Sequence, residues 1–248
     1  MEKTMKPHVQ IKRIHFLLAL LALTVCAIPF RDRLVRSVRI AKNAYDIRQR
    51  LVQHGPAVRE RLAQDFDQTN CHYPPAKLLL VGLKEERLLE VWVKSAAGQG
   101  YTLLRVYPIQ GTSGKAGPKL AEGDLQVPEG IYRIDWLNPN SHYHLSMRID
   151  YPNEHDKARA AEDGRKNLGD DIMIHGGRAS IGCLAMGDEA AEDLFVLVAE
   201  TGLPNVEVIL SPVDFRTRDL PRKVNPGWTD ELYHIIKGRL LNVSAKPM

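Results

Sequence analysis

Several features are missing from this sequence, and each absence excludes a class of protein. The longest apolar run, from Phe16 to Phe30, has 15 residues, fewer than the ~20 that cross a bilayer comfortably. No basic patch is interleaved with aromatic residues, so the net charge of +4 does not indicate a nucleic-acid-binding protein. There is also no His-Glu-x-x-His motif, the usual sign of a zinc peptidase.

The first 30 residues are typical of an export signal. Positive charges precede the apolar run, at Lys3, Lys6, Lys12 and Arg13. Val25-Cys26-Ala27 permits cleavage after Ala27, whereas Ile28-Pro29 leaves an uncleaved membrane anchor open. Both alternatives place the rest of the chain outside the cytoplasm. We do not expect lipidation of Cys26, because Leu23-Thr24-Val25 is a poor lipoprotein signal.

Cysteine is scarce, with only Cys26, Cys71 and Cys183 in the chain. Removal of the signal would leave two cysteines in an oxidising compartment, where a disulfide between them is one alternative. We expect the other alternative, a free thiol at Cys183, because a nucleophilic cysteine has to be reduced. The redox state of Cys71 stays open.

Residues 172–186 contain the strongest chemical signal. The apolar run Ile172–Ile174 ends at His175, and a glycine- and serine-containing loop then leads to Cys183. A strand that ends on a histidine, and a loop that returns a thiol toward it, can form a cysteine nucleophile with an adjacent base. Glycines let such a loop direct N–H groups at a developing oxyanion. The alternative is a buried structural cysteine and a histidine that only stabilises a strand end.

This segment resembles the L,D-transpeptidase catalytic-domain family, which acts on peptidoglycan stem peptides. The family's His-Gly and Ser-x-Gly-Cys motifs are matched by His175-Gly176 and by Ser180-Ile181-Gly182-Cys183. Upstream, the segment from Val127 to Tyr132 is similar to the family's Thr-Pro-x-Gly motif, with Val127 in place of threonine. The resemblance extends from Ala76 to Pro212, a little over half of the chain.

Three departures from the general family pattern are present. The loop between His175 and Cys183 holds only seven residues, Ile181 stands where a histidine is usual, and Ala185 stands where an arginine is usual. In ordinary members that arginine helps to hold a carboxylate of the stem peptide, so its absence leaves the substrate or acceptor open. These features, with residues 117–151, are similar to one branch of the family. That branch includes the enzyme that detaches murein-bound lipoprotein from peptidoglycan.

The resemblance implies acyl transfer through a thioester. Cys183 would be the nucleophile, His175 its base, and the carbonyl of Gly176 the group that orients the imidazole. Backbone groups near Gly182, in a loop that also holds Ser180, would stabilise the oxyanion. No cofactor is implied.

Substrate and partners are implied by the resemblance in the same way. We expect a periplasmic enzyme that acts on peptidoglycan stem peptides, with hydrolysis that detaches linked lipoprotein favoured. Arg178 and His144 are the candidate substrate-binding residues. A cross-linking or protein-anchoring transpeptidase is one alternative, and a non-catalytic peptidoglycan-binding module is another.

A metal site is a separate alternative. His142 and His144 are two apart in a predicted strand, and His155 and Asp171 are near in sequence, so the set could hold zinc. Because these residues lack a clean ligand spacing, we expect no metal. We expect His144 to face the catalytic cleft and His142 to face solvent.

The hydrophobic pattern predicts a mainly β fold with flanking helices, an L,D-transpeptidase-like β-sandwich that carries the cysteine loop at one end. We divide the chain into a signal or anchor (1–30), a helical segment and connector (31–75), the catalytic domain (76–212) and a C-terminal extension with a helix (213–248). The expected helices are 31–53, ended by Gly55-Pro56, then 57–66, 188–201 and 228–240. The expected strands are 77–83, 88–94, 101–107, 130–136, 143–151, 171–175 and 205–210. Two polar segments, 111–129 and 151–170, are expected to be loops that form the walls of a cleft. For 111–129, a mobile surface loop without a role in substrate binding is an equal alternative.

Overall fold

The computed structural model describes residues 45–96, 100–220, 224 and 226–244. The expected export signal, its cleavage site and the start of the first expected helix lie outside these residues. Within the described ranges, no helix combines the length and the apolar character needed to cross a bilayer.

Eight strands form one sheet in the order β3-β2-β1-β8-β4-β5-β6-β7. The strands are β1 (Lys77–Leu83), β2 (Leu88–Lys94), β3 (Thr102–Pro108), β4 (Gly130–Ser141), β5 (His144–Ile149), β6 (Met173–His175), β7 (Leu184–Ala185) and β8 (Val206–Ser211). The β1–β8 and β6–β7 pairings are parallel, and the other pairings are antiparallel. The prediction of a mainly β fold with flanking helices is confirmed.

Strand β4 joins the two halves of this sheet. Its residues 130–133 pair with β8, and its residues 134–141 pair with β5. The register shifts between Ile134 and Trp136, as in a β-bulge, which bends a strand and increases its twist. The half of the sheet that carries His175 is therefore continuous with the half that holds the buried strands β1 and β8.

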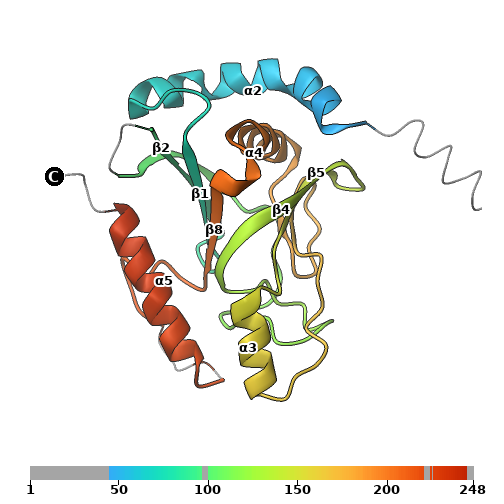
Figure 1. The fold of residues 1–248 in the computed structure, drawn as a ribbon, viewed down its shortest axis with the longest axis vertical. Helices are drawn as coiled ribbons and strands as arrows, with labels where there is room; N and C mark the ends of the chain where they lie inside the picture. The colour runs from blue at the N-terminus through green and yellow to red at the C-terminus, as the bar shows by residue number, and fades with distance from the viewer. Residues whose placement is uncertain (1–44, 97–99, 221–223, 225, 245–248) are drawn as a thin grey trace, which may run out of the picture. The chain divides into compact units, whose positions relative to one another are not determined.

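The sheet is buried on both faces, which explains the unbroken apolar sequence of β1. Leu78 and Leu80 of β1 point into the larger core cluster, while Leu79 and Val81 point into the smaller one. Helices α2 (Ile47–Thr69) and α4 (Asp188–Thr201) cover one face, and α5 (Thr229–Ser244) covers the other (Figure 1). Alternate side chains of an extended strand point to opposite faces, so both sets can be apolar.

Helix α2 corrects the expected helix boundary at Gly55-Pro56. The helix begins after Asp46, which forms a capping box with Gln49, and runs through Pro56 to Thr69. An internal proline costs about 3 kcal/mol. The buried face of the helix, which includes Val58, Leu62 and Phe66, offsets that cost by packing on the core.

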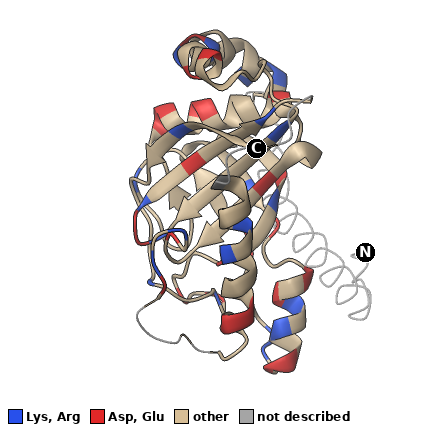
Figure 2. Ribbon diagram, turned by 90° about the vertical axis from the view of Figure 1, so that its left-hand side faces the viewer, with Lys and Arg blue, Asp and Glu red and all other residues tan. Residues whose placement is uncertain are grey.

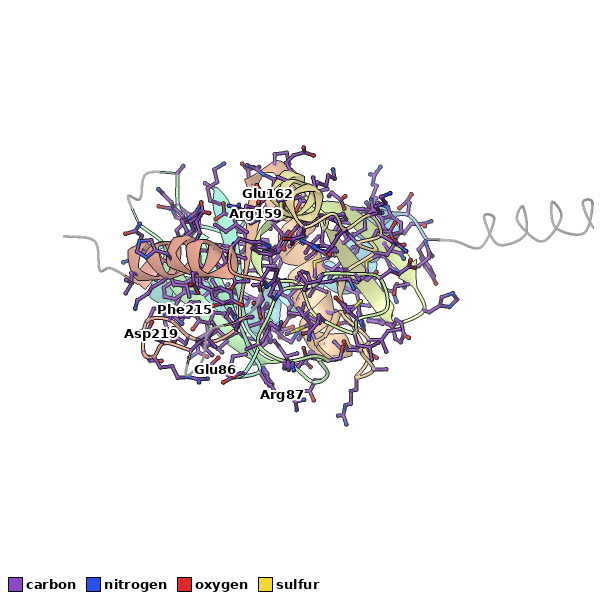
Figure 3. All side chains as sticks on the ribbon, turned by 90° about the horizontal axis from the view of Figure 1, so that it is seen from below. Glu86, Arg87, Arg159, Glu162, Phe215 and Asp219 are labelled. Atoms are coloured by element: carbon purple, nitrogen blue, oxygen red, sulfur yellow. The ribbon has the colours of Figure 1, made fainter. Side chains whose placement is uncertain are left out.

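A second correction concerns residues 151–170, which were expected to form a loop. They contain α3 (Glu154–Glu162), capped by Asn153, whose side chain accepts a hydrogen bond from the N–H of Asp156. Only Ala160 of this helix is buried, so no apolar period marks it in the sequence. Arg159 of α3 pairs with Glu162 at 2.9 Å and with Glu231 of α5 at 2.6 Å; the first pair is labelled in Figure 3.

The remaining expected helices are confirmed, with shifted ends for α5. Residues of both charge signs are spread along the helices, whereas the strands are mostly uncharged (Figure 2). The N-cap of α4 is Gly187, and Asp188 is the first helical residue. The Asp188 carboxylate accepts a hydrogen bond from the N–H of Gly177 at 2.8 Å, in the loop that precedes Cys183.

Candidate active site

The parallel pair β6–β7 brings His175 and Cys183 to the same place. Strand β6 ends at His175, and Cys183 immediately precedes β7, whose Leu184 pairs with Ile174. The sulfur of Cys183 accepts the backbone N–H of Met173 at 3.4 Å. The short loop therefore returns the thiol beside the strand that the chain has just left, as the sequence predicts.

Both side chains line a cavity of about 530 Å³. Lys119 and Leu125 come from one expected wall, and Gly169 and Asp170 come from the other. Around the opening, Ile181, Leu125 and Tyr143 are 80%, 50% and 49% exposed. The cavity is thus a cleft that has the thiol and imidazole among its lining residues and apolar side chains at its rim.

His175 is held in one orientation. Its side chain is almost fully buried, and Nδ1 lies 2.6 Å from the carbonyl oxygen of Gly176. Because a carbonyl oxygen only accepts, Nδ1 carries the proton and Nε2 is left as the basic nitrogen. The ring of Tyr143 lies against the imidazole, with centroids 4.6 Å apart.

Burial shifts both pKa values toward the neutral forms. It lowers the pKa of His175, and the hydrogen bond to Gly176 opposes this only in part. It raises the pKa of the Cys183 thiol, an effect opposed by the N–H of Met173 and reinforced by the charge of Asp171. The resting pair is therefore a neutral thiol and a neutral imidazole. Proton transfer accompanies attack on a substrate.

Glycine is required at position 176. A Cβ atom there would lie 2.6 Å from the carbonyl oxygen of Tyr143 and 2.7 Å from Oδ1 of Asp188. Real Cβ atoms essentially never come this close to such atoms. The bare backbone lets the turn pass close to Tyr143, which keeps its carbonyl oxygen on Nδ1 of His175.

The structure places the other predicted loop residues near the thiol. The hydroxyl of Ser180 donates a hydrogen bond to the carbonyl oxygen of Cys183 at 2.6 Å and so closes the loop. Gly182 is buried with φ of 119°, in the region that favours glycine. Arg178 is exposed and is not among the residues that line the cavity.

The two histidines of the β4–β5 turn exchange their expected positions. His142 lines the cavity, whereas His144 pairs with Glu192 of α4 and does not line it. The rule that residues two apart share a face fails because these residues form a tight turn, and His144 has φ of 72°. Sequence reasoning also missed Tyr143 and Lys119 as cavity residues, and it named Asp171 only as a possible metal ligand; no motif marks their place in the cavity.

Cys71 and Cys183, the cysteines of the described residues, form no disulfide with each other, and a free thiol at Cys183 stays a prediction. Cys71 follows the end of α2 and is buried in the larger core cluster. Burial raises the pKa of its thiol as well. Cys71 therefore behaves as a small apolar core residue.

Comparison with known proteins identifies relatives of the described region. The family model for the L,D-transpeptidase catalytic domain (YkuD) matches residues 76–210. A curated relative in Escherichia coli K12, YafK, is named as a provisional L,D-transpeptidase. It is 39% identical over 145 residues, which make up 56% of this chain and 55% of YafK. The chain thus spans about half the length of the curated relatives it matches.

Two solved structures are also similar. The helical cell shape determining protein Pgp2 of Campylobacter jejuni has a TM-score of 0.46 and 18% identity, over 69% of this chain and 71% of Pgp2. L,D-transpeptidase 1 of Mycobacterium tuberculosis has a TM-score of 0.34 and 13% identity, over 54% of this chain and 62% of its own.

Proposed function

This chain belongs to the L,D-transpeptidase catalytic-domain family, and we propose that it is a periplasmic cysteine acyltransferase that acts on amides of peptidoglycan stem peptides. Its role would lie in cell-wall biogenesis and cell shape. One observation supports this most directly. Cys183 and the buried, oriented base His175 line one cavity from neighbouring parallel strands.

The reaction has two halves that share one intermediate. Nε2 of His175 accepts the thiol proton as Sγ of Cys183 bonds to the substrate carbonyl carbon. The C–N bond then breaks, the imidazolium returns the proton to the leaving amine, and a thioester remains. Each backbone donor to the tetrahedral oxyanion is worth about 3 kcal/mol of barrier. Attack by water on the thioester gives hydrolysis, whereas attack by an amine gives a new amide.

Position 185 supports the lipoprotein-detaching variant of this chemistry. Ala185 is fully buried, and its carbonyl accepts the N–H groups of Gln110 and Gly111. A Cβ on Gly111 would lie 3.3 Å from the Cβ of Ala185. No long cationic side chain fits there, so the stem-peptide carboxylate is not held from this position as in ordinary members. We therefore propose hydrolytic detachment of peptidoglycan-linked lipoprotein as the main activity.

The test uses the purified protein and purified sacculi that carry bound lipoprotein. Mass spectrometry of the products is expected to show released lipoprotein with a free, hydrolysed end. Cys183→Ala is expected to abolish release and to change thermal stability little, since the side chain is small and partly exposed.

The other outcomes separate the alternatives. Cross-linked muropeptide dimers without release would favour a cross-linking transpeptidase. No product, together with no labelling of Cys183 by iodoacetamide or a carbapenem, would contradict the enzymatic proposal and favour a binding module. A Cys183→Ala protein that keeps its activity but loses stability would show that Cys183 is a core residue.

A further inference from the structure

A histidine–glutamate cluster lies outside the catalytic cavity, where three elements meet. It consists of His54 from the first half of α2, His144 from the start of β5, and Glu192 from the first half of α4. None of these residues lines the cavity. They are separated by 90 and 48 positions, so no sequence motif reveals them.

The donor atoms converge on a single point. Nδ1 of His54 and Nε2 of His144 lie 3.2 and 2.9 Å from the same oxygen, Oε1 of Glu192. All three donor atoms are within 4.8 Å of one another, and the two rings are nearly perpendicular, at 86°. Ligand atoms around a tetrahedral zinc ion lie about 3.3 Å apart, as zinc–ligand bonds of about 2 Å require.

We propose that this cluster is a zinc site. Two imidazoles and one carboxylate are a ligand set that zinc uses, with a fourth position left to water. His144 and Glu192 are partly exposed, with 27% and 19% of their side-chain surface accessible, so water can reach that position. His54 is the buried ligand and Glu192 supplies the negative charge.

His54 is held in the cluster through Nδ1, which faces Glu192. The residue is 9% exposed, and its other nitrogen, Nε2, is buried without a hydrogen-bond partner among the described residues. Burying a polar ring costs free energy that a single neutral hydrogen bond offsets only in part. A zinc–Nδ1 bond would add stabilisation on the cluster side of the ring and would leave Nε2 unpaired.

Nearby charges leave the site able to accept a cation. Arg61 approaches Oε2 of Glu192 at 3.3 Å, but it lies closer to Asp193, at 2.6 Å. Oε1, on which the two histidines converge, has no arginine partner among the described contacts.

A metal bound here would fix the β4–β5 turn, which packs against the catalytic loop. The Cβ of His144 lies 3.0 Å from where a side chain on Gly176 would begin, and the preceding residue, Tyr143, rests on the imidazole of His175. The ion would join α2 to the turn that contacts the catalytic histidine. Its role is structural, because it lies outside the cavity that receives the substrate.

The test uses Cys183→Ala protein, so that the catalytic thiol cannot bind the metal. After saturation with zinc and dialysis, metal analysis is expected to find one zinc per chain, and chelation is expected to lower Tm. In this background, Glu192→Gln and His54→Ala are expected to weaken zinc binding by more than about tenfold. His72→Ala, which alters an exposed histidine outside the cluster, is the matched control and should bind zinc unchanged.

Cobalt substitution of the same Cys183→Ala protein tests the ligand type without altering any residue of the cluster. This cobalt protein should show the visible bands of a tetrahedral site and lack the thiolate charge-transfer band. No bound metal after saturation would overturn the proposal. So would a thiolate band, or zinc retained equally in Glu192→Gln, His54→Ala and the control.

Discussion

At the scale of single residues, the site keeps its thiol and its base uncharged until they react. Burial raises the pKa of Cys183 and lowers that of His175, so neither effect favours an ion pair in the resting protein. The charge of Asp171 adds to the effect on Cys183. Reactivity toward small alkylating reagents should therefore follow the thiolate fraction of Cys183.

Asp171→Asn is expected to make Cys183 easier to ionise. Removal of a negative charge lowers the thiol pKa, so the midpoint of the pH–rate profile for iodoacetamide alkylation moves down, and the rate at neutral pH rises. We expect a rise of a few-fold at low salt that shrinks with added salt, because Asp171 is exposed and screened. Asp170→Asn, at the neighbouring position, should leave the profile in place; an equal shift in both variants would contradict this account.

Gly176→Ala is expected to abolish turnover and to destabilise the fold by roughly 1–3 kcal/mol. The new Cβ would meet the carbonyl oxygen of Tyr143, which cannot move without shifting the β4–β5 turn. Chemical denaturation and turnover assays measure the two effects. Gly227→Ala, where nothing lies within 4 Å of the new atom, should change neither; a fully active Gly176→Ala enzyme would show that the turn adapts.

At the scale of elements, α2 runs through a proline because tertiary packing outweighs the local preference. Pro56→Ala restores a helical N–H at an exposed position and is expected to raise the free energy of unfolding by about 1–3 kcal/mol. Urea denaturation measures the change, and Ala57→Gly, on the same exposed side, should lower it by about 1 kcal/mol. A less stable Pro56→Ala protein would mean that the proline ring itself makes stabilising contacts.

The sequence predicts strands better than it predicts helix ends. The apolar runs of β1 and β8 and the His-Gly and Ser-x-Gly-Cys motifs located the sheet and the thiol–imidazole pair, because local pattern determines both. Helix α3 has one buried residue, so no periodicity could mark it. The position of His144 depends on its backbone angle in a two-residue turn, and the meeting of Tyr143 with His175 depends on strand order. Neither feature can be predicted from local sequence.

At the scale of the whole described unit, the C-terminal helix is part of the fold although it follows the matched family region. Ile236 and Leu240 of α5 pack with Val81 of β1 and Ile209 of β8 in the smaller core cluster. Tyr233 of the same helix donates a hydrogen bond to the fully buried Glu129. The extension therefore closes the second face of the sheet.

Two adjacent isoleucines of α5 test this. Ile236 is fully buried and Ile235 is 44% exposed. We expect Ile236→Ala to lower the free energy of unfolding by about 2–5 kcal/mol, and Ile235→Ala to change it by no more than about 0.5 kcal/mol. Equal effects in urea denaturation would show that α5 does not pack as described.

The raised pKa of Cys183 also bears on its survival in an oxidising compartment. Peroxide and disulfide reagents attack the thiolate, and the protonated sulfur reacts slowly with both. Burial beside a neutral imidazole therefore shields the sulfur from sulfenic acid formation and from mixed disulfides. The pocket that raises the thiol pKa thus also slows oxidation of Cys183 at neutral pH, and transfer of the proton to His175 during attack on an acyl substrate forms the reactive thiolate.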